Sequence, residues 1–380
     1  MSENVQKTLR DSAALRWLAL ILLAGAMFCS YIFMDILSPI KDLMWDTKGW
    51  DSTAFGTMQG SETFLNVFVF FLIFAGIILD KMGVRFTAIL SGAVMLVGAT
   101  INWYALTDMF AGSNLEVWFN EHLNYIPGFD ELGVSPFYKG MPASAKFSAI
   151  GFMIFGCGVE MAGITVSRGI VKWFKGREMA LAMGSEMALA RLGVATCMIF
   201  SPMFARLGGE VSVSRSVAFG VVLLMIALIM FIVYAFMDKK LDSQTGEAEE
   251  KDDPFKLSDL GKILTDSGFW LVALLCVLYY SAIFPFQKYA VNMLQCNLVF
   301  HQVDPSSIWA SNTITIIQYV IMLVVAACAF ASNFSKNKVA KYGLMGVAIV
   351  ALVVFCYMGY MRQSAETVFA VFPLLAVGIT

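Results

Sequence analysis

The sequence predicts an all-α, polytopic membrane protein, and three observations lead to this class. Hydrophobic residues make up 59% of the chain, charged residues make up only 14%, and the mean hydropathy is +0.73. Apolar runs of about 20 residues recur along the chain, and each could cross roughly 30 Å of hydrocarbon as a helix. A soluble domain of this size could not cover so much apolar surface with polar groups. A soluble class is therefore excluded.

The first apolar run, from Trp17 to Ile36, predicts a retained membrane helix. It follows Lys7, Arg10 and Arg16. It is too long for the core of a signal peptide and lacks a small-residue cleavage site, so we do not expect a cleaved leader.

Hydropathy predicts six spans, then a polar segment, then further spans. The first six are expected near 16–38, 57–79, 85–106, 147–170, 178–201 and 216–237. The segment "MDKKLDSQTGEAEEKDDPFK" is too charged to be buried and predicts a cytoplasmic linker. Later spans are expected near 268–294, 308–331 and 342–361, with a last one from about 365. The expected regions are a six-helix bundle at 1–237, a linker at 238–266 and a partial second bundle at 267–380.

Lysines and arginines in the short loops predict a cytoplasmic N-terminus. The loops near 80–85 and 171–177 are basic, like the N-terminal segment. The long loop at about 107–146 is acidic overall and is expected to face outward. We expect a plasma membrane, which in a bacterium is the inner membrane.

Two short echoes suggest a duplicated architecture. "RWLALILL" at 16–23 is similar to "FWLVALLC" at 269–276, and "ETFLNVF" at 62–68 is similar to "ETVFAVF" at 366–372. The two motifs lie about 51 residues further apart in the second half of the chain than in the first. This excess is the length of two extra helices with their turns. We therefore expect an inserted helical hairpin at 301–362 and a C-terminally truncated second half. The alternative is that the echoes are chance and these spans are ordinary eighth and ninth helices.

Several kinds of chemistry find no support in the sequence. The seven cysteines are scattered among apolar runs and suit packing, and His122 and His301 share no metal-ligand spacing. No Walker-type phosphate loop is present, nor are basic patches that alternate with stacking aromatics. We therefore expect neither an enzyme, a cofactor, a metal site nor a nucleic-acid partner.

The loop "GIILDKMGVR", 76–85, has the pattern of a conformational latch. Gly76 would allow close helix packing, Gly83 a tight turn, and Asp80 with Lys81 and Arg85 a charged cluster at the cytoplasmic surface. The alternative is an ordinary basic loop. The pattern resembles the signature of the major facilitator superfamily, which implies a 6+6 helix pseudo-repeat and transport by alternating access.

A second resemblance narrows the branch. "SRGIVKWFKGREMALAMGSEMALARLG", 167–193, and "CVLYYSAIFPF", 276–286, are similar to the branch that contains the lysosomal dipeptide transporter and its bacterial relatives. The resemblance covers residues 15–300 and resumes near 365. The segment 301–362 does not match, which agrees with an insertion.

Glu160 in "FGCGVEMAGITV" is the residue that most needs an explanation, because a lone carboxylate in lipid is costly. Glu160 lies about 13 residues, or roughly 20 Å, into a helix from 147, and Arg191 lies equally deep in a helix from 178. Both therefore approach the bilayer midplane on consecutive antiparallel helices. They either pair only with each other or face a solute path. The resemblance implies that they hold the ammonium and carboxylate ends of a dipeptide.

Five more residues are considered. Glu186 would face the cavity as a proton-coupling carboxylate, or lie solvated at the cytoplasmic mouth; Asp35 and Glu62 are expected to be solvated at outer helix ends. Tyr279 and Tyr280 would either pack or line the cavity, where a hydroxyl could bind substrate.

The resulting hypothesis is a secondary or facilitative transporter of small zwitterionic or anionic solutes, with dipeptides as the substrate class and the lipid bilayer as its surroundings. The alternatives are a proton-coupled organic-anion carrier and a non-transporting receptor or scaffold on the same fold. The sequence leaves open whether an accessory subunit is needed.

Overall fold

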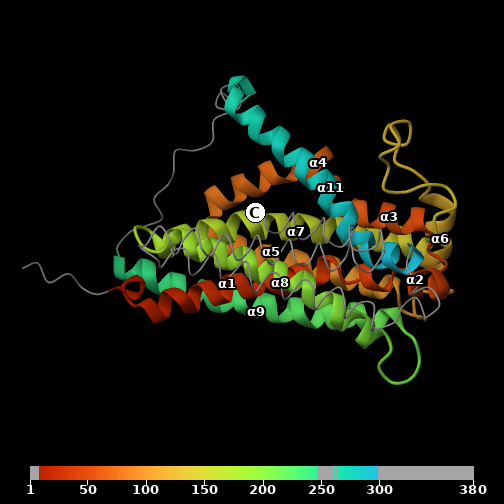
Figure 1. Ribbon diagram of the computed structural model, residues 1–380, viewed down its shortest axis with the longest axis horizontal. Helices are drawn as coiled ribbons and strands as arrows, with labels where there is room; N and C mark the ends of the chain where they lie inside the picture. The colour runs from red at the N-terminus through yellow and green to blue at the C-terminus, as the bar shows by residue number, and fades with distance from the viewer. Residues whose placement is uncertain (1–7, 246–260, 262–263, 298–380) are drawn as a thin grey trace, which may run out of the picture. The chain divides into compact units, whose positions relative to one another are not determined.

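The computed structural model describes residues 8–245, 261 and 264–297, and these residues form helices joined by turns and loops (Figure 1). Five helical segments in this part are long and apolar enough to cross a membrane: Ala13–Lys48, Phe71–Ala105, Ala143–Phe174, Met179–Ala205 and Val213–Gln244. The first of these is one long helix followed by two short ones. The all-α polytopic class is therefore confirmed. The expected hairpin at 301–362, the last span and His301 lie outside the described residues.

The chain forms two compact units, and each is described by itself. Of the described residues, the first holds 8–37, 43–194 and 204–245, and the second holds 38–42, 195–203, 261 and 264–297. The helices, in chain order, are η1 (Leu9–Asp11), α1 (Ala13–Met34), η2 (Ser38–Ile40), α2 (Lys41–Lys48), α3 (Ser52–Gly60), η3 (Ser61–Thr63), α4 (Phe64–Phe68), α5 (Phe71–Ala105), α6 (Asn114–His122), α7 (Ala143–Phe174), α8 (Met179–Ala205), α9 (Val213–Thr245) and α11 (Ser267–Asn297).

The long helix α5 consists of two helical parts joined by a turn at Gly83. Gly83 has φ 80° and ψ 168°, which are not helical values, and helical residues lie on both sides of it. Only glycine adopts this region readily, because any Cβ would clash with the backbone. The sequence predicted a turn here, between the spans near 57–79 and 85–106, and that prediction is confirmed.

Replacing Gly83 with alanine should lower the free energy of unfolding by about 1–3 kcal/mol, because the turn would then force an L-residue into a glycine-only conformation. Gly76→Ala is the matched control in the same element, since a Cβ at Gly76 would meet nothing within 4 Å. That control should be neutral or slightly stabilising. Thermal unfolding in detergent measures both variants, and equal melting temperatures for the two would contradict the prediction.

The expected second span, near 57–79, is not one helix, and on this point the prediction was wrong. The segment is divided into α3, η3, α4 and the first half of α5, and Phe70 between α4 and α5 is left-handed, with φ 55°. Hydropathy reports how apolar a segment is and not whether its backbone is continuous. The run "VFVFF" at the break is built from β-branched and aromatic residues, which favour helix less than leucine or alanine.

Helices α5 and α7 pack with their backbones almost in contact. A Cβ built at Gly98 would lie 2.5 Å from the Gly151 carbonyl oxygen, and one at Gly158 would lie 2.7 Å from the Met95 nitrogen. Gly98 meets Gly151, whereas the earlier residue Met95 meets the later residue Gly158. The second half of α5 is therefore antiparallel to α7. Small residues allow such close approach between membrane helices, where dispersion contacts stabilise the pair.

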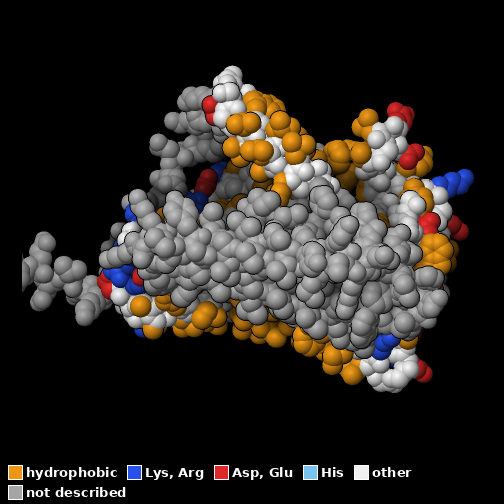
Figure 2. Space-filling model, in the orientation of Figure 1, with side chains coloured by type: hydrophobic (Ala, Val, Ile, Leu, Met, Phe, Trp, Pro, Cys, Tyr) orange, Lys and Arg blue, Asp and Glu red, His pale blue; other side chains and the backbone are white. Residues whose placement is uncertain are grey.

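Helix α9 presents an apolar face to the surroundings. Its exposed large side chains include Val222, Met225, Ile226, Ile229, Val233 and Phe236. Hydrophobic side chains follow the lower edge of the molecule in Figure 2, where Figure 1 places α9. A continuous exposed apolar face of this kind is expected where a helix contacts lipid.

The loop between α5 and α7 is anchored by a buried lysine. Lys146 is 1% exposed, and its ammonium group donates hydrogen bonds to the Phe119 carbonyl and to the Asn124 amide oxygen, each at 3.1 Å. Beneath it, Phe110, Phe119 and Ala143 form a small buried cluster. The end of the first unit that carries this loop and α6 is called the α6 end below, and the opposite end the Gly83 end.

Candidate functional site

Glu160 lies at the middle of α7. It is 17 residues from Ala143 and 14 residues from Phe174, so roughly 20–25 Å of helix extends on either side. Its side chain is exposed, and within the described part of the chain it makes no hydrogen bond or ion pair. A carboxylate placed this way needs water, a cation or a ligand as its partner.

Arg191 lies at a similar depth on α8. It is 12 residues from Met179 and 14 residues from Ala205 and is half-buried. Its guanidinium carbon lies 6.0 Å from the centroid of the Tyr31 ring on α1, within cation–π range. Nearby, a Cβ at Gly193 would lie 2.5 Å from the Phe28 carbonyl oxygen, so α8 packs tightly on α1 at this level. Sequence reasoning missed Tyr31, because only packing brings α1 to Arg191.

No ion pair joins Glu160 to Arg191 among the described residues. The alternative in which the two side chains serve only to hold each other is therefore not the arrangement in this structure. Glu160 and Arg191 each lie near the middle of a helix without pairing with the other, and the Tyr31 ring lies beside the Arg191 guanidinium.

Three other carboxylates are buried, although solvation was expected for Asp35 and Glu62 and was one alternative for Glu186. Asp35 is 3% exposed, Glu62 is 8% exposed and Glu186 is 7% exposed. The predictions for Asp35 and Glu62 were wrong because both lie where the chain changes direction and packs against a neighbouring element. Glu62 sits in η3 with its backbone pressed against Gly156 of α7, since a Cβ there would overlap the Glu62 carbonyl oxygen. Glu186 is buried on α8 rather than solvated.

The latch residues are paired with other helices rather than with one another. Asp80 accepts a hydrogen bond from Arg168 of α7, and Arg85 pairs with Asp242 of α9 at 2.9 Å. Lys81 is exposed. The close packing expected at Gly76 is absent among the described residues, because a Cβ there would meet nothing within 4 Å.

A buried carboxylate, Asp238 on α9, lies among the charged residues of the Gly83 end. Asp238 is fully buried and accepts hydrogen bonds from the Lys172 ammonium at 2.7 Å, the Trp173 indole at 3.0 Å and the Tyr234 hydroxyl at 3.4 Å. The Lys172 ammonium also lies 2.7 Å from a carboxylate oxygen of Asp242. Through Asp242 and Arg85, the pair connects α7, α9 and the second half of α5.

Lys172→Met should destabilise the protein by about 3–5 kcal/mol, because it leaves the Asp238 charge buried without its cation. Arg168→Ala removes a more exposed pair on the same helix and should cost no more than about 1 kcal/mol. Thermal unfolding of both variants checks the difference. If Lys172→Met is as stable as Arg168→Ala, the buried pair does not stabilise this end of the bundle.

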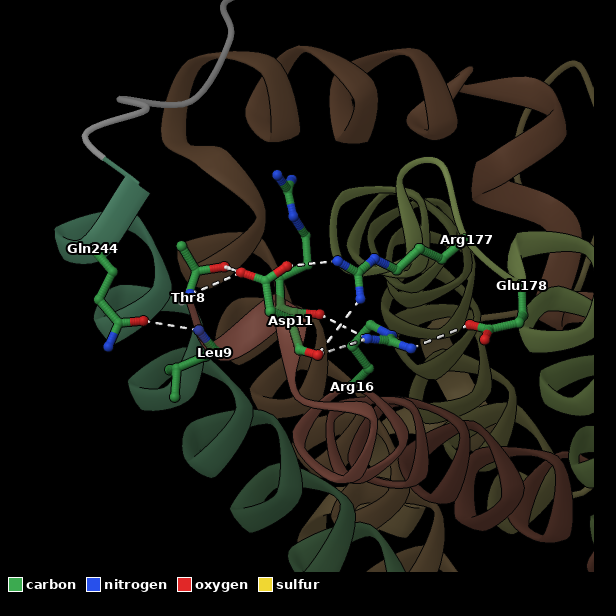
Figure 3. Close-up of polar contacts among 8 residues, drawn as sticks. Thr8, Leu9, Asp11, Arg16, Arg177, Glu178 and Gln244 are labelled. Atoms are coloured by element: carbon green, nitrogen blue, oxygen red, sulfur yellow. Dashed lines mark hydrogen bonds and ion pairs between the residues drawn. The ribbon is translucent and has the colours of Figure 1, made fainter. Parts of the chain in front are cut away.

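The N-terminal segment closes the Gly83 end through a second set of polar contacts (Figure 3). Asp11 pairs with Arg177, Arg16 pairs with Glu178 at 3.3 Å, and the Leu9 N–H donates to Gln244 at 2.9 Å. Hydrogen bonds from the Thr8 N–H and hydroxyl, together with the Arg177 charge, hold the pKa of Asp11 below its usual value. These contacts connect η1 to the α7–α8 turn and to the end of α9.

Tyr279 and Tyr280 lie on α11, in the second unit. Their rings meet edge to face with centroids 5.2 Å apart, and the Tyr280 ring also stacks on Phe284 at 5.0 Å. Both rings thus have packing partners within α11. A substrate-binding role for either tyrosine stays a prediction.

Within the described ranges, no three His, Cys, Asp or Glu side chains gather as metal ligands would. The cysteines described there, which are Cys29, Cys157, Cys197 and Cys276, are free thiols.

The fold and these charged groups define a helical membrane protein with opposite charges, Glu160 and Arg191, near the middle of two of its helices. Residues 23–380 match the family model of the Major Facilitator Superfamily, and the chain belongs to this family. A lysosomal dipeptide transporter of Pongo abelii is 24% identical over 280 residues, which are 71% of this chain and 52% of that protein. The corresponding protein of Danio rerio is 30% identical over 145 residues, 36% of this chain and 31% of that protein.

The chain thus spans about half or less of the length of the curated relatives it matches. Among solved structures, a D-xylose–proton symporter has a similar fold, with a TM-score of 0.54 at 12% identity over 97% of this chain and 80% of that one. At this identity the likeness concerns the fold alone. The family indicates a membrane-embedded transporter of a small molecule rather than an enzyme.

Proposed function

We propose that this protein is a secondary or facilitative transporter of small zwitterionic solutes, with dipeptides as its substrate class. The observation that carries the proposal is the presence of Glu160 and Arg191 at mid-depth on α7 and α8, with no ion pair between them. Transporters bind solutes near the bilayer midplane, and charges at that depth usually face a water-filled path.

The two residue types suit the two ends of a zwitterion. The Glu160 carboxylate would accept hydrogen bonds from an ammonium group, and the planar guanidinium of Arg191 would bind a carboxylate through two parallel hydrogen bonds. Tyr31, beside Arg191, would keep the guanidinium oriented through its ring face. The relatives named as lysosomal dipeptide transporters support this substrate class, as does the similarity at residues 167–193.

Ion pairs at the Gly83 end would determine which conformation of the transport cycle is favoured. We infer that the Gly83 end faces the cytoplasm, because its turns carry Lys81, Arg85, Lys175 and Arg177. The pairs Asp80–Arg168 and Arg85–Asp242 would then favour one side of an alternating-access cycle and release in the other. By the same rule the α6 end faces outward, and a plasma membrane is the proposed location.

A proton-coupled organic-anion carrier is the second candidate, and one observation favours it. Glu186 is buried, at 7% exposure, five residues before Arg191 on the same helix. A buried carboxylate can exchange protons as its surroundings open and close. In that case Arg191 would bind the anion, and Glu160 or Glu186 would carry the proton.

Uptake into proteoliposomes tests the proposal. Saturable uptake of a radiolabelled dipeptide, with counterflow when the vesicles are preloaded with unlabelled dipeptide, is the expected result. Uptake that requires an imposed proton gradient and accepts dicarboxylates instead of dipeptides would favour the second candidate. Dipeptide binding without any flux would show a receptor on a transporter fold and would contradict transport.

A further inference from the structure

The amide of Asn66 is buried with no hydrogen-bond partner. Asn66 is the polar residue of α4, "FLNVF", and both its amide nitrogen and its amide oxygen are inaccessible and unbonded within the described structure. An amide buried without partners costs about 1–3 kcal/mol, and the cost rises in surroundings without water. A group retained at this cost needs either a function or a ligand that satisfies it.

Asn66 lies at the same level as Glu160. The segment Trp50–Phe68 runs parallel to α7, because Trp50 bonds to Ser144 at 2.9 Å, Ser61 bonds to the Ala149 carbonyl at 3.0 Å, and Glu62 meets Gly156 further along. Asn66 is four residues after Glu62. Glu160 is four residues after Gly156. One helical turn beyond the Glu62–Gly156 contact on each element, the amide and the carboxylate are therefore neighbours in depth.

The chain also breaks at this level. Residues 69 and 70 separate α4 from α5, Phe70 is left-handed, and Val69 and Phe70 are 51% and 63% exposed. The Val69 N–H bonds to the Leu65 carbonyl and the Ile73 N–H to the Phe70 carbonyl, but helix ends generally leave further backbone groups without intrahelical partners. Irregular backbone at membrane depth occurs where it is buried in protein or lines a water-filled cavity, and broken helices form the substrate sites of many transporters.

We propose that Asn66 is a specificity-determining residue that binds the peptide group of the solute. This inference rests on the proposed function. In a dipeptide the peptide carbonyl carbon is only two bonds from the ammonium nitrogen, so an ammonium bound at Glu160 places the peptide group within reach of a neighbour. The Asn66 amide nitrogen would donate to the peptide carbonyl. A trans peptide directs its N–H to the opposite side, so the solute satisfies the amide nitrogen that the protein leaves unbonded.

Two probes that differ only in the peptide group test this role. Glycylglycine and 5-aminopentanoate carry the same charged ends separated by four chain atoms, but 5-aminopentanoate has two methylene groups in place of the peptide group. Each probe competes with a radiolabelled dipeptide for uptake by the full chain in proteoliposomes. The wild type should prefer glycylglycine by about tenfold or more, since only glycylglycine supplies the hydrogen-bond partner that the buried amide lacks.

Asn66→Leu should remove this preference. Leucine has the same number and branching of side-chain heavy atoms as asparagine and removes an unbonded amide, so the fold is expected to tolerate it. The affinity for glycylglycine should fall by about tenfold, while that for 5-aminopentanoate should stay within about twofold of the wild-type value. Asn102→Leu is the matched control, because Asn102 on α5 carries a second buried, unbonded amide at the packed α5–α7 interface. It should leave the preference unchanged.

The outcomes separate this inference from the proposed function. If Asn66→Leu weakens both probes equally, or keeps the preference for glycylglycine, Asn66 does not read the peptide group and the inference is overturned. If the wild type binds 5-aminopentanoate and glycylglycine equally well, the zwitterion site stands and the role of Asn66 falls. If the wild type binds neither probe, the proposed function itself fails, and the inference with it.

Discussion

Arg191→Ala is expected to lower dipeptide uptake by about a hundredfold, and Glu160→Gln by a similar factor. Each change removes one charge from a low-dielectric site and leaves one end of the zwitterion unpaired there, and truncation of one partner in such a pair costs about 2–5 kcal/mol. The half-buried position of Arg191 and its contact with Tyr31 keep the guanidinium in place, so its loss is not expected to be repaired by a neighbour.

The two variants should also differ in which end of the solute they fail to recognise. The wild type should discriminate strongly against N-acetylated dipeptides and against dipeptide amides. Glu160→Gln should lose most of the discrimination against the N-acetylated probe, because a neutral amide no longer favours an ammonium group. Arg191→Ala should lose most of the discrimination against the C-terminal amide.

Lys139→Ala provides the control, since Lys139 is an exposed cation in the loop between α6 and α7. Uptake by this variant should match the wild type. Undiminished uptake by both Glu160→Gln and Arg191→Ala would place the substrate elsewhere. A loss of protein from the membrane fraction in either variant would indicate a structural role, so expression and melting temperature are measured with every uptake assay.

Gly156→Ala is expected to destabilise the protein by about 1–3 kcal/mol and to weaken dipeptide binding at the same time. A Cβ at Gly156 would overlap the Glu62 carbonyl oxygen and would also lie 3.1 Å from the Glu62 Cγ, so η3 would have to move away from α7. Backbone cannot rotate aside as a side chain can, and overpacking of this kind costs about 1–3 kcal/mol, occasionally more. Because α4 follows η3 directly, the movement would also displace Asn66.

Gly163→Ala is the control on the same helix, because a Cβ at Gly163 would meet nothing within 4 Å. It should be neutral or slightly stabilising, as expected for alanine in place of glycine inside a helix. Thermal unfolding measures stability, and competition with glycylglycine measures binding. Equal melting temperatures for the two variants would show that α7 does not depend on a glycine at its contact with η3.

Much of the fold could be predicted because helix spans in a membrane depend on composition and length. The apolar runs predicted the positions of α1, α7 and α8 to within a few residues, and Gly83 within a charged loop predicted the turn in α5. The start of α9 was also predicted, but α9 continues to Thr245 through residues that were expected to belong to the linker at 238–266. The mid-helix depths of Glu160 and Arg191 also followed from counting, because each residue of a helix adds a constant rise.

Features that depend on contacts between distant segments could not be predicted in this way. Asp80 was expected to cluster with Lys81 and Arg85 but pairs with Arg168, which folding brings to it from α7. Glu62 was expected in solvent, but the glycine at 156 lets α7 press against its backbone and bury it. Asn66 is the one amide side chain in the run "TFLNVFVFF", and this could have marked it as a candidate site residue. Averaged hydropathy hides a single polar residue of this kind.

By itself, the sequence determined that this chain is an all-α membrane protein, where most of its long helices lie, and that Glu160 and Arg191 fall near the middle of their helices. These properties are local, since they depend on the hydropathy of neighbouring residues and on helix geometry. Only the tertiary structure decided that the second span breaks beside Asn66, that Tyr31 rather than Glu160 contacts Arg191, and that Asp238 is buried among the charged residues of the Gly83 end. Those outcomes depend on which backbones approach most closely, and that is set by glycines on separate helices that meet only in the folded protein.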